Sequence, residues 1–259
     1  MQRTMLWALM GALLMVLGLM TGCGGHKDSG SEVRPVASTS EKVFRIGYQK
    51  WSTLNVVRLR GDLDKQMAAQ GVRVEWLDFP AGPQMLEAMA SGSIDLGITG
   101  DAPVPFALAA GQPIVYVGNT PPGDETGESR AIVVPRNSPI HSVAELKGKR
   151  IAVQKGSGTH NFLTLALAKA GVEYKDVHMA YLAPPDARPA FESGSVDAWA
   201  IWDPYLAIAQ QSSGARTLVN GRGFATAGNF YLSSRDSVRK HADWIKAALT
   251  EADKTGIGW

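Results

Sequence analysis

The stretch RIGYQK (residues 45–50) returns later in the chain as RIAVQK (residues 150–155), and this pair of segments decides the fold. Each is a short strand-like run that ends in polar residues. A second pair keeps the same order: GSID (92–95) returns as GSVD (194–197), and an aspartate follows each at the same spacing, Asp101 and Asp203. Taken singly, such a segment marks only a helix end and a strand start. Three landmarks in one order predict a duplicated unit.

The repeated unit has the order strand, helix, strand, helix, strand. In the first copy the pattern predicts strands over 44–49, 72–79 and 94–99 and helices over 55–70 and 83–91. This order is typical of an α/β fold with helices around a mostly parallel sheet. We therefore predict two similar lobes with mixed, mostly parallel sheets and a ligand cleft between them. Because ligands bind beyond the carboxyl ends of parallel strands, the loops expected at the cleft are 49–54, 80–84, 100–103, 155–161, 184–188 and 202–205.

The loop KGSGTHN (155–161) gives the most specific ligand signal. It lies between a predicted strand, 151–154, and a predicted helix, 161–170, and glycines allow backbone N–H groups at a helix start to approach an anion. Neither nucleotide motif is complete, because Asn161 replaces the third glycine of a dinucleotide fingerprint and Gly148-Lys149 lacks a following Ser or Thr. His160 either donates to the anion or caps and packs the first turn.

Two aspartates and a tryptophan are further candidates at the cleft. Asp101 and Asp203 each precede a proline that can open a helix, so helix capping is the favoured role, although both can line the cleft and orient Gln49 or Asn161. A carboxylate without a partner would repel a bound anion. Trp202 either faces the alkyl part of a ligand or belongs to the core.

Composition and motifs favour binding without turnover. The chain has no GxSxG or HExxH motif, its five histidines are scattered, and its one cysteine lies near the N-terminus, so we expect no enzyme, no metal and no cofactor. A net charge of +2 without a dense basic run predicts no nucleic-acid partner. Apolar residues make up 45% of the chain, and roughly 220 residues after the first 40 suffice for two lobes of about 100 residues each.

The N-terminal segment predicts export. An apolar run over 6–19, shorter than the about 20 residues of a spanning helix, ends in Met20-Thr-Gly-Cys23, which resembles the bacterial lipobox. We predict a signal peptide over 1–22, a lipidated Cys23 and a flexible tether over 23–41, which place the protein in the periplasm or cell envelope with a lipid anchor in the membrane. The alternative is a signal without lipid, or an uncleaved anchor.

Several segments together carry a family resemblance: RIGYQK, AGPQ (81–84), GSID, TGD (99–101), QKGS (154–157), HN (160–161), DAR (186–188), GSVDAW (194–199) and WDPY (202–205). They resemble the aliphatic sulfonate-binding proteins of bacterial ABC importers. The resemblance implies the type II periplasmic-binding-protein fold, an alkanesulfonate ligand taken up for sulfur supply, a membrane permease as partner, and a monomer. By resemblance, the ligand-binding residues are Gln49, Gly100, Asp101, Ser157, Gly158, Thr159, His160, Asn161, Trp202 and Asp203.

The resemblance also implies bounds for the two lobes. The chain differs from the family pattern in two places, and other functions stay open. Since the chain of this fold crosses twice between lobes, lobe one is predicted over 42–128 plus 226–259 and lobe two over 129–225. Gly158-Thr159 replaces the common Ser-Ala, and the chain stops at Trp259, just after a predicted helix, 241–254, whereas relatives continue through further helices. We therefore expect a truncated sequence or a variant without that support. Alternatives are a taurine- or nitrate-binding protein, or an enzyme such as a thiamine pyrimidine-precursor synthase, whose cysteine-rich iron site this chain lacks.

Overall fold

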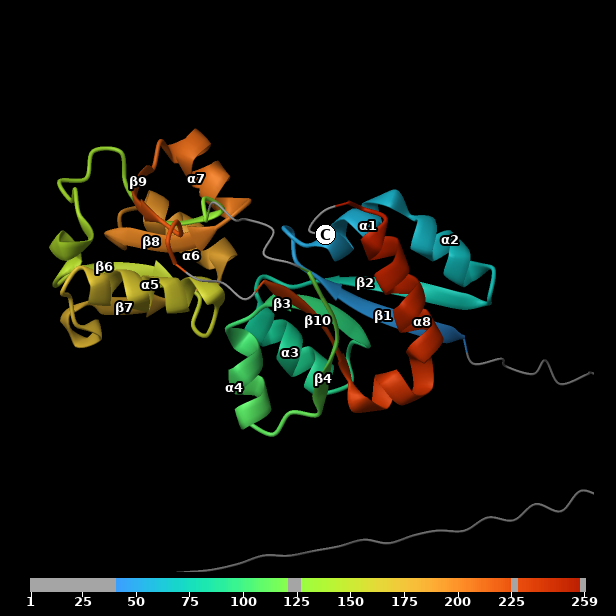
Figure 1. Cartoon of the computed structure of the whole chain (residues 1–259). Helices are drawn as coiled ribbons and strands as arrows, with labels where there is room; N and C mark the ends of the chain where they lie inside the picture. The colour runs from blue at the N-terminus through green and yellow to red at the C-terminus, as the bar shows by residue number, and fades with distance from the viewer. Residues whose placement is uncertain (1–40, 121–126, 225–227, 257–259) are drawn as a thin grey trace, which may run out of the picture. The chain divides into compact units, whose positions relative to one another are not determined.

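The computed structural model describes residues 41–120, 127–224 and 228–256 (Figure 1). Cys23, the predicted signal peptide and the predicted tether up to residue 40 lie outside this part of the chain. Ser40–Trp259 forms one compact unit, and it contains two five-stranded sheets. Within the described ranges, no helix has the length and apolar character needed to cross a membrane.

The first sheet follows the predicted strand pattern of the first repeat. Its strands have the order β2-β1-β3-β10-β4, in which β1 is parallel to β2 and β3, and β10 is antiparallel to β3 and β4. The bounds are β1 (Lys42–Tyr48), β2 (Val72–Asp78), β3 (Leu96–Gly100), β4 (Ile114–Thr120) and β10 (Asn229–Ser234). The strand added late in the chain thus sits inside the sheet, between β3 and β4.

The second sheet repeats this arrangement strand by strand. Its order is β7-β6-β8-β5-β9, with β6 parallel to β7 and β8, and β5 antiparallel to β8 and β9. The bounds are β5 (Arg130–Val134), β6 (Arg150–Val153), β7 (His178–Tyr181), β8 (Ala198–Trp202) and β9 (Arg216–Asn220). The predicted α/β class with mixed, mostly parallel sheets and an internal repeat is confirmed. The exact lobe bounds stay a prediction.

The repeated aspartate of GSID and GSVD explains why these segments recur. Asp95 accepts a hydrogen bond from the Arg45 N–H through Oδ2 at 2.9 Å, and Asp197 accepts one from the Arg150 N–H at 2.8 Å. In each copy the aspartate N–H also donates to the carbonyl of the same arginine, at 2.8 Å. Each aspartate therefore fixes the start of its own strand to the neighbouring parallel strand, β1 or β6.

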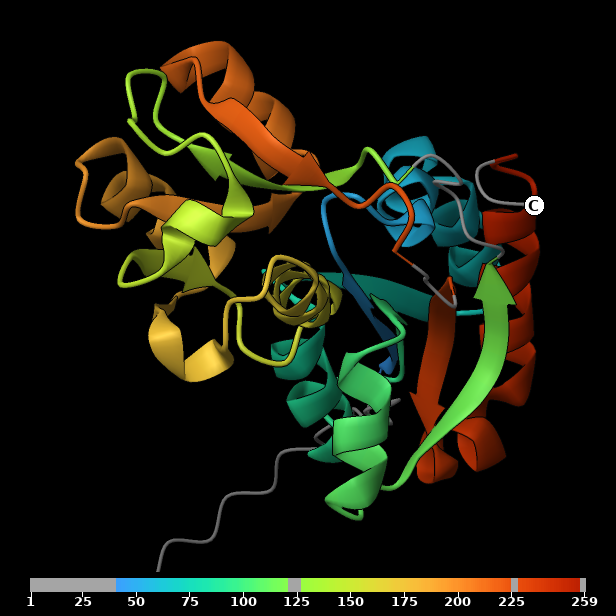
Figure 2. The same cartoon turned by 60° about the vertical axis from the view of Figure 1, so that its left-hand side comes forward.

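Helices cover both faces of the first sheet. Apolar side chains of α1, α2 and α8 pack on one face, and those of α3 and α4 pack on the other. Figure 2 shows these helices on the two sides of the sheet. The bounds are α1 (Thr53–Arg60), α2 (Asp62–Ala68), α3 (Gly82–Ala90), α4 (Pro103–Ala109) and α8 (Arg235–Asp253). The second sheet has α5 (Gly158–Lys169), α6 (Pro184–Glu192), α7 (Tyr205–Ser213) and two 3₁₀ turns, η1 (Val143–Leu146) and η2 (Tyr174–Asp176).

Three predicted helices differ from the structure at their ends or centre. The helix expected over 55–70 is two helices, because Gly61 adopts a left-handed conformation (φ 69°) that ends α1 and begins α2. The helix expected from Asn161 begins at Gly158, since the Ser157 side chain already caps the backbone. The helix expected from His241 begins at Arg235 and continues through a kink at His241.

Candidate functional site

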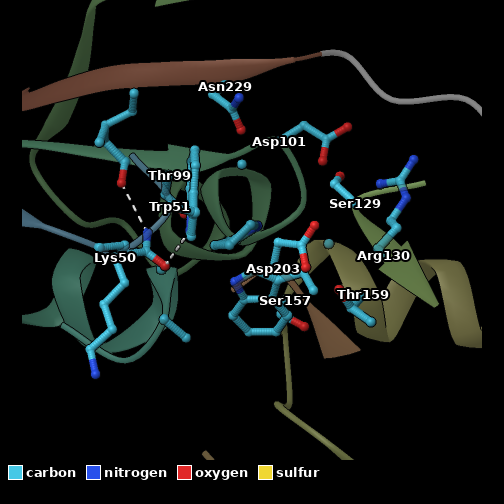
Figure 3. Close-up of a pocket in the computed structure, with 18 of the residues that line it drawn as sticks. Lys50, Trp51, Thr99, Asp101, Ser129, Arg130, Ser157, Thr159, Asp203 and Asn229 are labelled. Carbon is cyan, nitrogen blue, oxygen red and sulfur yellow. Dashed lines mark hydrogen bonds between the residues drawn. The ribbon is translucent and has the colours of Figure 1, made fainter. Parts of the chain in front are cut away.

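A cavity of about 440 Å³ is lined by residues from both sheets (Figure 3). Ligand pockets for small molecules have volumes of roughly 300–1,000 Å³, so a small organic molecule fits. Of the residues predicted to bind a ligand, those that line the cavity are Gln49, Gly100, Asp101, Ser157, Gly158, Thr159, Trp202 and Asp203. Five of the six predicted loops contribute to it, and only 184–188 does not.

The cavity lies where parallel strands end and antiparallel strands begin. In the first sheet the last residue of β3, Gly100, pairs with the first residue of β10, Asn229. In the second sheet the last residue of β8, Trp202, pairs with the first residue of β5, Arg130. All four residues line the cavity, so each sheet contributes one strand end and one strand start.

The start of α5 supplies polar groups from the second sheet. Ser157 and Thr159 are buried, and Ser157 Oγ accepts a hydrogen bond from the His160 N–H at 3.1 Å. The first N–H groups of a helix have no intrahelical acceptor, and they carry a partial positive charge. Because Ser157, Gly158 and Thr159 line the cavity, these donors are placed where an anionic ligand can accept from them.

Arg130 lines the cavity and carries a permanent positive charge, and it was not predicted from the sequence. Its guanidinium donates from Nη2 to the Phe224 carbonyl at 3.3 Å and lies 5.8 Å from the centre of the Phe162 ring. Its Nε is buried and has no hydrogen-bond partner among the described residues. Buried polar groups are normally paired, and a charged donor without a partner is costly. Arg130 itself lines the cavity, so it places a permanent positive charge beside a ligand bound there.

Gln49 and Trp51 form one wall of the cavity. The buried Gln49 side chain donates from Nε2 to the Ile98 carbonyl at 3.0 Å, and its Oε1 accepts from Trp51 Nε1 at 3.2 Å (Figure 3). Both ends of the Gln49 amide are therefore engaged in holding Trp51 against β3. Trp51 was not predicted individually, although its loop was.

The two aspartates of the cavity are engaged with backbone at the starts of helices. Asp203 Oδ1 accepts from the Ala207 N–H at 3.1 Å in the first turn of α7, so its side chain bonds this turn although Pro204, and not Asp203, stands at the predicted N-cap position. Asp101 Oδ1 accepts from the adjacent Ala102 N–H at 2.8 Å and does not cap α4, so the predicted N-cap role of Asp101 is wrong. Both carboxylates still line the cavity.

Two predicted ligand residues lie elsewhere. His160 and Asn161 are absent from the cavity lining, although they follow Thr159 directly. A helix turns by about 100° per residue, so the next side chains of α5 point away from the cavity. The His160 ring instead contacts Tyr174 and Tyr181, and Asn161 is exposed. Neither side chain lines the cavity, and a direct ligand contact from either one stays a prediction.

The cavity also has residues that the sequence patterns did not single out. They come from the loop after β1, from strand starts, from the ends of β3 and β4, and from the starts of helices: Lys50, Trp51, Thr53, Ala81, Gly82, Ile98, Thr99, Pro103, Thr120, Ser129, Arg130, Pro204, Gly228 and Asn229. Figure 3 shows Arg130, Ser129 and Thr159 on one side of the cavity, and Lys50 and Trp51 on the other. Among the residues of the described ranges, no three His, Cys, Asp or Glu side chains are grouped to hold a metal ion.

The repeated sheets and the cavity that they share define a binding protein of the periplasmic type, a class that the comparisons support. The chain is 46% identical over 220 residues to the "Putative aliphatic sulfonates-binding protein" of Escherichia coli (strain K12), covering 84% of this chain and 68% of that protein. A protein of the same name from Bacillus subtilis (strain 168) is 38% identical, covering 81% of this chain and 60% of that protein.

A solved structure supports the same grouping. The alkanesulfonate-binding protein SsuA from Xanthomonas axonopodis pv. citri, bound to MOPS, matches with a TM-score of 0.75 and 43% identity, covering 82% of this chain and 72% of that one. The NMT1/THI5-like family model matches residues 68–259. The chain therefore belongs to the NMT1/THI5-like family and, within it, to the group of aliphatic sulfonate-binding proteins.

Proposed function

We propose that this protein is the substrate-binding component of an ABC importer and that its cavity captures an aliphatic sulfonate. One observation carries the proposal: Arg130, a permanent cation, lines the same cavity as the N-terminal turn of α5. A cationic group and a helix start together suit a small anion. Kinship with sulfonate-binding relatives supports a sulfonate over other anions.

The donor set is sufficient for capture. The three oxygens of a sulfonate can accept from Arg130, from the N–H groups at Gly158 and Thr159, and from the Thr159 hydroxyl. Each hydrogen bond to a charged group contributes roughly 1.5–3 kcal/mol. Micromolar affinity corresponds to about 8 kcal/mol, so three to five such bonds are enough.

Two tryptophans of the cavity suit the carbon chain of the ligand. Trp51 and Trp202 both line the cavity, and the Gln49 amide holds the Trp51 ring in place. Burial of one methylene contributes about 0.8 kcal/mol. An alkanesulfonate with a few methylenes therefore binds more tightly than methanesulfonate, up to the length at which the cavity is full.

Calorimetry with a matched series tests the proposal. The series comprises methanesulfonate, ethanesulfonate and hexanesulfonate, with hexanoate and sulfate as controls for the anionic group. Binding of sulfonates with affinity that rises with chain length supports the proposal. Sulfate or carboxylate binding as tight as that of the best sulfonate contradicts it.

A zwitterionic ligand such as taurine is the second candidate. Two carboxylates, of Asp101 and Asp203, line the cavity, and a ligand with an amine opposite its sulfonate could use one of them. The chain is also 29% identical to the taurine-binding periplasmic protein of Escherichia coli (strain K12). Taurine and ethanesulfonate differ only in the amine, so a comparison of their affinities decides between the two candidates.

The anchor, the partner and the absence of turnover complete the proposal. We propose that Cys23 carries a lipid, that residues 23–41 tether lobe one (42–128 plus 226–259) and lobe two (129–225) to the cell envelope, and that the partner is a membrane permease. The lipobox-like sequence and the periplasmic relatives support this location. Mass spectrometry that finds an unmodified residue at the mature N-terminus would remove the anchor. Recovery of chemically unchanged ligand after incubation tests binding without catalysis.

A further inference from the structure

His160 stands in the first turn of α5 but points into a cluster outside the cavity. Its Nδ1 accepts a hydrogen bond from the Gly156 N–H at 3.2 Å, and its Nε2 lies 2.8 Å from the Tyr174 hydroxyl. That hydroxyl lies 2.5 Å from the hydroxyl of Tyr181. The chain of contacts runs from the loop before α5, through the imidazole, to two tyrosines at the surface.

The contacts fix the protonation state of the imidazole. A backbone N–H can only donate, so Nδ1 must present its lone pair to Gly156. The proton of the neutral ring is then on Nε2, where it donates to the Tyr174 hydroxyl, which is hydrogen-bonded to the Tyr181 hydroxyl. A second proton could bind only at Nδ1, where it would face the Gly156 N–H and abolish this hydrogen bond. The hydrogen bonds of this cluster therefore favour the neutral form of His160.

The same hydrogen bond holds the loop that leads into the cavity. Gly156 adopts a left-handed conformation (φ 75°), and the next residues, Ser157 to Thr159, line the cavity. We propose that neutral His160 is a positioning residue that holds this loop in its ligand-binding form, and that protonation of His160 weakens ligand binding. This inference rests on the proposed function, because it concerns the anion-binding part of the same cavity.

The groups that face His160 agree with this arrangement. Burial lowers the pKa of His160 below its ordinary value, and the charge of Lys155 lowers it further. Tyr174 from η2 and Tyr181 from β7 are the other titratable groups at the ring, and burial raises the pKa of Tyr174 to about 12, so it keeps its proton. Because the pKa of His160 in the folded protein lies below the ordinary value of about 6.5, His160 is neutral and keeps its hydrogen bond to the loop above about pH 6.5. As the pH falls through the lowered pKa, His160 gains a proton and this hydrogen bond is lost.

A protonated His160 would also attract an anion across space, and this effect has the opposite sign. The Tyr174 and Tyr181 side chains beside it are 40% and 45% exposed, so solvent and salt screen the new charge. Displacement of the loop changes the direct donors of the ligand, which we expect to dominate. The sign of the pH effect on affinity therefore distinguishes the two effects.

The test measures ethanesulfonate affinity by calorimetry at about pH 7.5 and about pH 5.5, between which a sulfonate stays ionised. We expect wild-type affinity to fall by roughly twofold to fourfold, because the lowered pKa leaves His160 only partly protonated at about pH 5.5, and a drop of about one pKa unit on binding sets an upper limit of about tenfold. In His160→Asn the carboxamide oxygen takes the place of Nδ1 and cannot titrate, so its affinity should change much less. His178→Asn, which removes an exposed histidine at the start of β7, should keep the wild-type profile.

NMR on the ligand-free wild type supplies a readout that needs neither variant folding nor ligand. The imidazole nitrogens should show the Nε2–H tautomer, and the Gly156 amide proton should shift with the titration of His160. Equal pH profiles in wild type and His160→Asn, tighter binding at low pH, or an Nδ1–H tautomer would each overturn the inference. Failure of the proposed function is different, because it leaves no ethanesulfonate binding at about pH 7.5.

Discussion

Replacement of Arg130 by methionine is the most direct test of the anion site. Methionine keeps much of the apolar stem of the side chain but removes every guanidinium donor, including the Nε that has no partner among the described residues. If the sulfonate accepts one or two hydrogen bonds from this group, the loss is roughly 1.5–3 kcal/mol for the first bond. At 1.4 kcal/mol for each tenfold change, the dissociation constant should rise by about 10- to 150-fold.

Calorimetry with hexanesulfonate measures this change, with Arg188→Met as the control. Arg188 lies in α6 outside the cavity lining and pairs with Glu192 at 2.8 Å, so its loss alters net charge equally without touching the cavity. The control should bind within about twofold of wild type, because surface ion pairs contribute little. Urea denaturation checks the fold, since Arg130→Met also loses its bond to the Phe224 carbonyl, about 1 kcal/mol. A folded Arg130→Met variant that binds like the control would refute the role of Arg130.

Three further predictions concern the framework of the site. Ser157→Ala removes the cap of α5 and should lower the free energy of unfolding by about 1 kcal/mol and weaken sulfonate binding, as measured by thermal melting and calorimetry; unchanged melting would contradict it. Gly82→Ala places a Cβ 1.9 Å from Thr99 Oγ1 and should cost about 1–3 kcal/mol in urea denaturation, whereas an unchanged midpoint would show that the contact relaxes freely. Asp95→Ala should destabilise more than Asp197→Ala, because Asp95 also accepts a bond from a serine of α8 at 2.8 Å, and equal midpoints would argue against this difference.

The repeat made most of the fold predictable, because it depends on local patterns. Alternation of strand and helix and the recurrence of GSID as GSVD predicted two sheets of the same order. The break at Gly61 was not predicted, since a single glycine within a helical pattern is often tolerated. The start of α5 at Gly158 was also not predicted, because it depends on the side-chain cap from Ser157, which lies within a glycine-rich segment typical of a loop.

The site was predicted less completely, for a topological reason. The rule used to find it concerns the carboxyl ends of parallel strands, and it led to Gly100 and Trp202. The residues paired with them, Asn229 and Arg130, open antiparallel strands, and their positions depend on pairing between segments far apart in the chain. His160 follows Thr159 but does not line the cavity, because adjacency in sequence does not keep two side chains on one face of a helix.

The two sheets place different residues at equivalent strand ends, so the two sides of the cavity differ in size and charge. Gly100 and Asn229 of the first sheet occupy the places that Trp202 and Arg130 occupy in the second. One half thus presents a small residue and a neutral amide, whereas the other presents a large ring and a permanent cation. A ligand with one charged end and one apolar end meets two unlike halves, and only one of its two orientations places its charge beside the cation. Exchange of Asn229 and Arg130 between the halves would separate the cation from the α5 donors, which stay in the second half.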